Sequence, residues 1–320
     1  MRNIFKKNKG EITSQQIVIL IVVIVSFAVL LVFLFRLNLG DTTDEELCHN
    51  SVLTRGSAVV PSDAVPLNCH RKYICITGKE GNCEGLTNPE RIEVESLSEI
   101  YETLADEMAN CWWMFGEGRV NYVGDDLTHN NYCSICSQIY FDEGLKSITG
   151  EKITKDGLYK FLENNNIDKT NTYAEYLFGG KNLDAIKKES LEKHGVESFG
   201  DIEVGKQYFV VMGITSEVGL WNWVGIGAGG GSAIVGAAVV SAIVFGTTPV
   251  GWVAGLTVIG LSAGAGGAVG VGIGETIEPE IATIILDGRG IDNKFMAPTI
   301  IEANSEKFNA LNCEEILTLA

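Results

Sequence analysis

Residues 95–118, ESLSEIYETLADEMANCWWMFGEG, contain the clearest helical pattern in the chain. Ser96 and Glu99 have the spacing of a capping box, and Gly116 is placed to end the helix. The pattern predicts an amphipathic helix whose apolar face, widened by two tryptophans, packs into a core and is fixed there by a disulfide. The apolar residues that recur at helical spacing are Leu97, Ile100, Leu104, Met108, Cys111 and Phe115.

Residues 17–35 carry no charged side chain. An α-helix of that length spans about 30 Å, the thickness of the hydrocarbon core of a bilayer. A basic leader, residues 1–16, precedes this stretch, and the acidic DTTDEE, residues 41–46, follows it. The positive-inside rule therefore predicts a transmembrane helix at 17–35 in the cell membrane, with its N-terminus in the cytoplasm and residues 36 onward outside.

The charge of the outer part limits its partners. The whole chain has a formal net charge of −17, and its first 35 residues hold four basic residues and one acidic residue. The remaining 20 basic and 40 acidic residues give the outer part a net charge of −20. Such a surface repels nucleic acids, so we exclude DNA and RNA. We expect the lipid bilayer and other protein chains, including copies of this chain, as partners.

All eight cysteines follow the apolar stretch. An even number in an oxidising compartment predicts up to four disulfides. One pairing follows from local sequence, because YICITGKEGNCEG, residues 73–85, is typical of a strand, a glycine turn and a second strand that would bring Cys75 next to Cys83. The other pairings stay open. The candidates are Cys48, Cys69, Cys75, Cys83, Cys111, Cys133, Cys136 and Cys313.

The outer part is predicted to be an α+β, disulfide-rich domain with an apolar hairpin inserted between its strands. Its successive regions are a cysteine-rich region (36–150), short helices followed by a strand (151–217), the glycine-rich hairpin (218–274), and strands with a C-terminal tail (275–320).

Three strands and two further helices are expected in the later regions. Thr154 is placed to cap a helix over KDGLYKFLENN, and a strand is predicted at 206–215. Segments 280–290 and 298–304 are predicted strands with DGRG as a turn. The tail is predicted to be helical and to return Cys313 to the cysteine-rich region.

The insert between Glu217 and Glu275 contains no charged residue. GTTPV, residues 246–250, divides it into two arms of roughly twenty residues, each long enough to span a bilayer. We predict a helical hairpin in the membrane, packed through small residues four apart. One alternative is a hairpin buried within the outer domain. The other is a segment that inserts into the membrane only under certain conditions. The helix-packing glycines are Gly225, Gly229, Gly227, Gly231, Gly251, Gly255, Gly260, Gly264, Gly266 and Gly270.

No motif in the chain predicts catalysis, a cofactor or a metal. GIGAGG, residues 225–230, matches a dinucleotide-binding loop, but no acidic residue follows before Glu275. Cys133 and Cys136 form a C-x-x-C pair, which we assign to the disulfide framework. The alternatives for that pair are a zinc site completed by Cys111 and His129, and thiol–disulfide exchange.

The leader resembles the class III signal peptides of archaeal type IV pilin-like proteins: a short basic segment, Lys9-Gly10, a few polar residues and then the apolar helix. The resemblance implies cleavage between Gly10 and Glu11 by a prepilin peptidase, after which the helix serves as an anchor and then as filament core. Gln15 departs from the pattern, because bacterial pilins carry glutamate at that position. The outer region, with CHNSV, NCHRKYIC and NCWWMFGEG…YCSICSQ, looks like uncharacterised membrane proteins of small-genome archaea, a resemblance that brings no activity with it.

These patterns favour a membrane-anchored cell-surface protein with a structural or interaction role, and the leader's resemblance adds the hypothesis of a pilin-like protein or a component of pilus machinery. One alternative is a membrane-active protein whose hairpin inserts or oligomerises, as in pores or fusion machinery. Another is an extracytoplasmic thiol–disulfide protein.

The resemblance to class III signal peptides implies that the protein extracted from its native membrane lacks residues 1–10. Cleavage after Gly10 removes the four basic residues that hold the helix end in the cytoplasm. Intact mass spectrometry measures this directly, and the mass gained on reduction counts the disulfides. A full-length mass would contradict cleavage and make the helix a permanent anchor.

Overall fold

The computed structural model describes residues 17–27, 43–57, 65–79, 81–124, 127, 131–180, 183, 198–216, 238–240, 257–259, 284–309, 311 and 313–319. The chain divides into two units, Met1–Asp44 and Glu45–Ala320. In the first unit, residues 17–27 are helical. Within the residues described, no helix combines the length and the apolar character needed to cross a bilayer. The predicted span, 17–35, continues beyond the described part of this helix.

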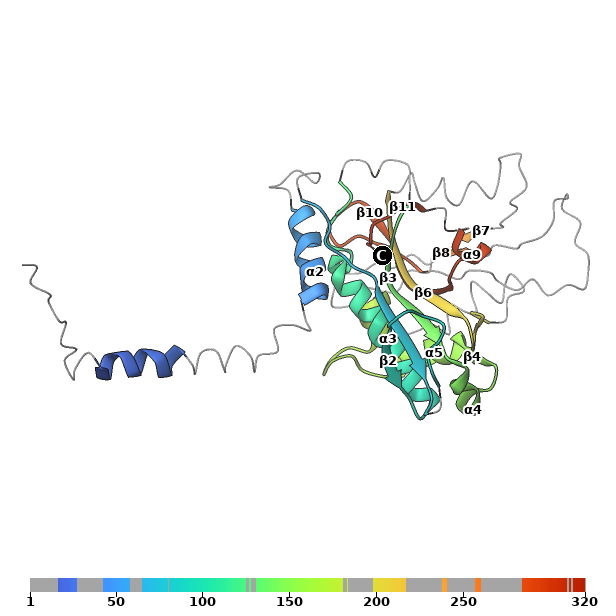
Figure 1. Cartoon of the computed structure of the whole chain (residues 1–320). Coiled ribbons are helices and arrows are strands. Elements are labelled where there is room, and N and C mark those ends of the chain that lie inside the picture. Colours follow the sequence, from blue (N-terminus) through green and yellow to red (C-terminus); the bar gives the residue numbers. More distant parts are fainter. Residues whose placement is uncertain are drawn as a thin grey trace, which may run out of the picture. The chain divides into compact units, whose positions relative to one another are not determined.

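The second unit is an α+β domain built on a mixed seven-stranded sheet, which confirms the predicted class (Figure 1). β1 pairs in parallel with β2 and β3, and β11 also pairs in parallel with β3. The pairs β3–β6, β6–β10 and β10–β9 are antiparallel. In sheet order the strands are β2 (Glu90–Glu93), β1 (Lys72–Thr77), β3 (Asn131–Phe141), β6 (Gln207–Ser216), β10 (Asn293–Glu302) and β9 (Ile285–Asp287), with β11 (Cys313–Ile316) beside β3.

Helices cover one face of this sheet, which we call the helical face. The main core lies there and combines apolar side chains of four helices with those of β1, β3, β6, β9 and β10. The helices are α2 (Thr43–Arg55), α3 (Leu97–Met114), α5 (Lys155–Asn164) and α6 (Tyr173–Phe178). Shorter elements are η2 (Gly116–Gly118), η3 (Glu143–Leu145), α4 (Lys146–Thr149), α9 (Glu306–Asn309) and the paired strands β4 (Lys152–Thr154) and β5 (Asp201–Glu203).

α3 is the helix that the first pattern predicts. The Ser96 side chain accepts a hydrogen bond from the Glu99 backbone amide, so the predicted cap is present. Ile100, Leu104, Met108 and Cys111 are fully buried on its inner side, together with Trp112. The predicted cap of α5 is confirmed as well, because the Thr154 side chain accepts from the Gly157 amide.

The opposite face of the sheet, which we call the second face, carries a smaller core. α9 contributes Phe308, whose ring packs against Phe209 at a centroid distance of 5.1 Å. The buried members of this cluster are Cys133, Ile135, Phe209, Val211, Ile285, Met296, Ile301 and Leu311.

A bulge in β3 sets which side chains reach each face. Ile135 pairs with Val211 and Ser137 with Val210, so Cys136 is the extra residue. Cys136 belongs to the helical-face core, whereas Cys133 belongs to the second-face core. Residues three apart in a strand face opposite sides in any case. The bulge reverses the alternation beyond it, so Ile139 belongs to the helical-face core and Gln138 and Tyr140 face the other side.

β10 is longer than predicted and also contains a bulge. It begins at Asn293 rather than at 298, and its register with β6 shifts between Met296 and Thr299. Pro298 lies in this interval. Proline has no amide hydrogen for the ladder, and the bulge accommodates it within a central strand. The strand predicted at 206–215 is confirmed as β6.

Three sequence predictions differ from the structure. β2 pairs with β1 in parallel, so Cys83 lies in a loop and not on the second strand of a hairpin. The tail is helical only at α9, and β11 follows it, because pairing with β3 outweighs local helix preference. In the glycine-rich insert, β7 (Ala238–Val240) and β8 (Thr257–Ile259) are antiparallel strands where helix was predicted. The rest of 218–274 lies outside the described residues.

A charged pair lies under α3. Glu107, which is 8% exposed, accepts a hydrogen bond from Lys72 Nζ at 3.2 Å. Lys72 also reaches Glu90 at 3.3 Å and Glu45 at 3.9 Å, so it connects β1 with α3, β2 and α2. Burial raises the pKa of the Glu107 carboxyl, and the charge of Lys72 opposes that rise. The positive charge of Lys72 therefore offsets part of the free-energy cost of burying the Glu107 carboxylate.

We expect Lys72→Met to lower the free energy of unfolding by about 2 kcal/mol at pH 7. This is less than the cost of breaking a fully buried pair, because Lys72 is one-third exposed. Since burial raises the folded-state pKa of Glu107, the deficit should shrink as the pH falls towards the ordinary glutamate value of about 4.3. Urea unfolding of the wild type and the variant, at pH 7 and at about pH 4.3, measures this change in the stability difference. Lys72→Met/Glu107→Leu is the control and should recover most of the loss; no recovery would contradict the pairing.

Candidate functional site

The eight cysteines form four disulfides, and all eight lie within the described residues and none of them is free. The predicted Cys75–Cys83 pairing is confirmed. The sequence left the other three open, and the structure assigns them as Cys48–Cys69, Cys111–Cys136 and Cys133–Cys313. Together they attach α2, α3 and the C-terminal strand to the centre of the sheet.

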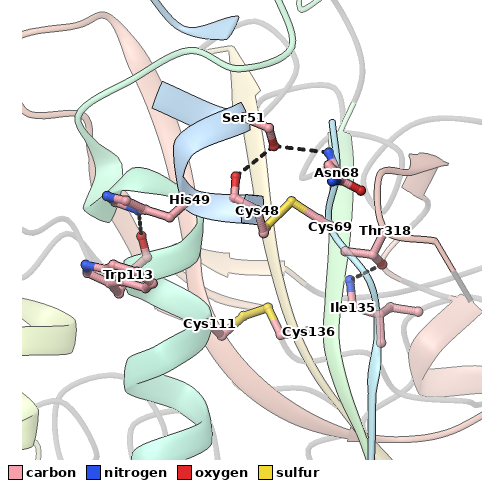
Figure 2. The surroundings of a disulfide bond; sticks show 10 residues. All are labelled: Cys48, His49, Ser51, Asn68, Cys69, Cys111, Trp113, Ile135, Cys136 and Thr318. Carbon is pink, nitrogen blue, oxygen red and sulfur yellow. Dashed lines mark hydrogen bonds between the residues drawn. A yellow bond between two sulfur atoms is a disulfide. The ribbon is translucent and has the colours of Figure 1, made fainter. Parts of the chain in front are cut away.

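Two of these disulfides lie close together on the helical face (Figure 2). Cys111–Cys136 joins α3 to the bulge of β3, and Cys48–Cys69 joins α2 to the segment that leads into β1. The Ile135 amide beside the bulge donates to Thr318 Oγ1 at 3.1 Å, so the C-terminal segment satisfies a backbone group next to the bulge. The covalent and hydrogen-bonded links thus fix the same point of β3.

His49 and Trp113 form a stacked pair beside these disulfides (Figure 2). Their ring centroids are 4.1 Å apart with an interplanar angle of 9°, and His49 Nδ1 lies 2.6 Å from the Trp113 carbonyl oxygen. A carbonyl can only accept, so Nδ1 carries the hydrogen. The pair thus attaches α2 to the C-terminal turn of α3, while the Cys48–Cys69 disulfide attaches α2 to the segment before β1.

The C-x-x-C pair is not assembled into a zinc or dithiol site. Cys136 is bonded to Cys111, and Cys133 is bonded to Cys313 on the other face of the sheet. The three thiols proposed for zinc therefore do not converge, and His129, the fourth proposed ligand, lies outside the described residues. Cys133 and Cys136 remain members of the disulfide framework, as the sequence favoured.

One cluster has the composition of a metal site. The sulfur atoms of Cys75 and Cys83 and a carboxylate oxygen of Asp142 all lie within 4.8 Å of one another and are buried. The sulfurs are joined to each other, however, and Asp142 accepts hydrogen bonds from Thr77 Oγ1 at 3.0 Å and the Cys83 and Gly144 amides at 3.0 and 2.9 Å. The carboxylate therefore holds the polypeptide around the disulfide.

The segment held in this way is the Cys83 loop, residues 81–89. A Cβ on Gly81 would lie 1.8 Å from Thr77 Oγ1, and one on Gly85 would lie 2.5 Å from the Tyr140 ring. Cys83 and Asn88 adopt left-handed backbone conformations, with φ of 58° and 52°. A disulfide, a buried carboxylate and two close backbone approaches thus fix this loop against the sheet.

Beside the Cys83 loop, the second face carries polar and aromatic side chains instead of a closed core. We call this group the polar platform: Arg71, Tyr73, Gln138, Tyr140 and Gln207, all half-buried. Cross-strand register places Tyr73 opposite Gln138, and Tyr140 opposite Gln207, so they share one face of β1, β3 and β6.

Hydrogen bonds run across the polar platform in one direction. Arg71 donates to Gln138 Oε1 at 3.4 Å, and Gln138 Nε2 donates to Gln207 Oε1 at 2.6 Å. Gln207 Nε2 then donates to the Gly85 carbonyl of the Cys83 loop at 2.5 Å. The Arg71 guanidinium also lies 5.2 Å from the centroid of the Phe209 ring. These contacts hold the side-chain amides of Gln138 and Gln207 and the Arg71 guanidinium in place in the unbound protein.

The polar platform is suited to binding rather than to proton transfer. Partial burial raises the pKa of the Tyr140 phenol, and the charges of Asp142, Glu143 and Glu84 add to the rise. Tyr140 therefore stays neutral near pH 7, and glutamine does not titrate. The available chemistry is hydrogen bonding and aromatic contact.

Sequence reasoning did not identify the polar platform. The signal was present in SQIYF, residues 137–141, where Gln138 and Tyr140 alternate with apolar side chains that face α3. The predicted cleavage site at Gly10 and Glu11, the ten helix-packing glycines and GIGAGG all lie outside the described residues.

Comparisons of the chain with protein-family models, curated proteins and solved structures find no match.

We expect the disulfides to contribute unequally to stability. Cys133–Cys313 spans 180 residues and Cys75–Cys83 spans 8. By loop-closure entropy, replacing both cysteines of the long link with serine should cost about 5 kcal/mol, against about 2.5 kcal/mol for the short one. Urea unfolding of the two double variants tests the ranking, with Cys75→Ser/Cys83→Ser as the matched control. Equal losses would contradict the entropic account.

Proposed function

We propose that this protein is a membrane-anchored cell-surface protein whose cross-linked outer domain binds a partner through the polar platform. The observation that carries the proposal is the chain of hydrogen bonds from Arg71 through Gln138 and Gln207 to the Cys83 loop. It orders a half-buried polar and aromatic surface on a sheet that carries a disulfide cross-link on each face.

Preorganisation is the physical reason to expect binding at the polar platform. Ordering a flexible side chain at an interface costs roughly 0.5–1.5 kcal/mol, and side chains already held in place avoid much of that cost. Tyrosine and arginine are also the residue types that dominate binding energy at protein interfaces. Tyr73, Tyr140 and Arg71 supply both types within one surface.

The disulfide framework supports an extracytoplasmic location for the domain. Four disulfides that consume every cysteine are typical of proteins that fold in an oxidising compartment. The apolar stretch at 17–35 supplies the proposed anchor, and the basic leader supplies its orientation. The resemblance to class III signal peptides makes a pilin-like role, or a role in pilus machinery, the specific form of this proposal.

A second candidate function is membrane activity of the glycine-rich insert. Ser216, the last residue of β6, pairs with Asn293, and the Ala297 amide donates to the Ile284 carbonyl at 2.8 Å. The strands that flank the insert, β6 and β9, thus pair with opposite edges of β10, so the chain is in the same sheet before and after it. Leakage of dye from liposomes by the purified protein would favour this candidate.

The thiol–disulfide alternative has less support. A dithiol oxidoreductase needs its two cysteines close enough to form and break one bond, with an accessible thiolate. Cys133 and Cys136 point to opposite faces and are both buried.

We expect a photo-crosslinking amino acid at position 73 or 140 to capture a partner on intact cells. Both positions lie on the polar platform, so a bound partner is within reach. The matched control is position 160, an exposed residue of α5 on the helical side of the sheet. Adducts are detected by mass spectrometry after irradiation.

Adducts at 73 and 140 without an adduct at 160 are the predicted result. With the adduct identified, Gln138→Ala should weaken its binding by about tenfold, because the substitution breaks the hydrogen-bond chain. Equal adducts at all three positions, or none at the platform positions, would contradict the proposed surface.

A further inference from the structure

One end of the polar platform carries the Tyr140 phenol against the Cys83 loop. Tyr140 lies in a row across three strands, opposite Cys75 of β1 and opposite Gln207 of β6. The loop touches the tyrosine ring, because a Cβ on Gly85 would lie 2.5 Å from Tyr140 Cε2. Glu84 directly precedes Gly85, and consecutive Cα atoms are about 3.8 Å apart. The loop contact therefore places Glu84 beside the tyrosine, and we call Tyr140 with Glu84 the acidic end of the polar platform.

Three carboxylates act on the Tyr140 phenol. Besides partial burial, the charges of Asp142, Glu143 and Glu84 raise its pKa. Two of these carboxylates already have partners within the protein. Asp142 accepts three hydrogen bonds, and Glu143 pairs with Lys146 at 2.6 Å.

Glu84 is the carboxylate that remains available to a partner. It is exposed and accepts a hydrogen bond from Asn82 Nδ2 at 2.8 Å, and among the described residues it forms no ion pair. The preceding residue, Cys83, is bonded to Cys75, and its amide donates to Asp142 at 3.0 Å. The backbone that carries Glu84 is therefore fixed while Glu84 itself is accessible.

The arginines of the second face are distant from the acidic end. Arg91 is paired with Cys75, which is paired with Tyr140, so two strand spacings, about 10 Å, separate the backbones of Arg91 and Tyr140. Arg71 lies four residues before Cys75, about 13 Å along the chain of β1, and its guanidinium lies over the Phe209 ring. Salt screens charges beyond about 8 Å at physiological ionic strength. The acidic end therefore keeps its negative charge.

We propose that the partner of the polar platform is a protein that places a lysine or arginine side chain on Tyr140, beside Glu84. This inference rests on the proposed function of the platform and names the chemistry of its partner. A cation is attracted to the face of an aromatic ring, and the Glu84 carboxylate can pair with the same cation. A neutral glycan would use the phenol and the amides but would gain nothing from this carboxylate.

The charge of the whole outer part favours the same partner. Its net charge is −20, and a strong charge of one sign accelerates association with a surface of the opposite sign. Long-range attraction thus brings a basic surface to the domain, and contact with Tyr140 and Glu84 positions it. The amides of Gln138 and Gln207 lie on the same face to bind the polar groups around the basic side chain.

The test places the photo-crosslinking amino acid at position 73 of the full-length protein, in membranes isolated from the native cells. This position shares the platform but leaves Tyr140 and Glu84 unchanged. We expect a polypeptide adduct whose yield falls about fivefold in Glu84→Gln, and which also falls when sodium chloride is raised from about 50 to about 300 mM. Glu102→Gln, which removes an exposed carboxylate of α3, is the matched control and should leave the yield unchanged.

The captured peptide gives a second readout. The backbones of residues 73 and 140 are about 8 Å apart across β1 and β3, so a lysine or arginine should lie within about three residues of the adduct. Digestion with a protease that does not cut at basic residues preserves this segment for mass spectrometry. Changing that basic residue to glutamate should abolish the adduct with the wild type and restore it with Glu84→Lys.

The outcomes separate this inference from the proposed function. No adduct at position 73 would contradict the binding surface, and the basic partner with it. A polypeptide adduct with equal yields in Glu84→Gln and Glu102→Gln would overturn the basic partner alone. An adduct with a glycan or a lipid would also overturn the basic partner and leave the binding surface in place.

Discussion

The attachment of β3 on both of its faces is the constraint on which the rest of the structure depends. β3 pairs with β1, β11 and β6, and its Cys136 faces α3 while Cys133 faces the other side. Disulfides from these two residues hold the main helix on one face and the C-terminal strand beside the other. Without the bulge at Cys136, strict alternation would change which face the remaining residues of β3 present.

The same constraint positions the polar platform and the end of α3. Beyond the bulge, β3 turns Ile139 and Phe141 into the main core and presents Gln138 and Tyr140 on the second face, where the Cys83 loop and Gln207 fix them. α3, pinned at Cys111, ends at the strained turn that carries Glu117 and Arg119. A rigid scaffold that presents polar groups at fixed positions is typical of interaction domains, and this is the role we propose.

The local sequence patterns predicted individual helices and strands well, but they predicted poorly which strands pair with each other. The cap and apolar spacing of α3, the cap of α5, strand β6 and the Cys75–Cys83 link all depend on contacts near in sequence. β2 pairs in parallel with β1, and the tail becomes β11, because strand partners distant in sequence decide both outcomes. The polar platform combines residues from positions 71 to 207. No local pattern could bring those side chains together.

Disulfide mapping of the protein isolated from its native membrane tests the central claim most directly. Digestion without reduction, followed by mass spectrometry, identifies which cysteine-containing peptides are joined. The account predicts a peptide pair linking Cys111 with Cys136 and a separate pair linking Cys133 with Cys313. A bond between Cys133 and Cys136, or free thiols at these positions, would contradict a sheet fastened on both faces and the extracytoplasmic binding domain built on it.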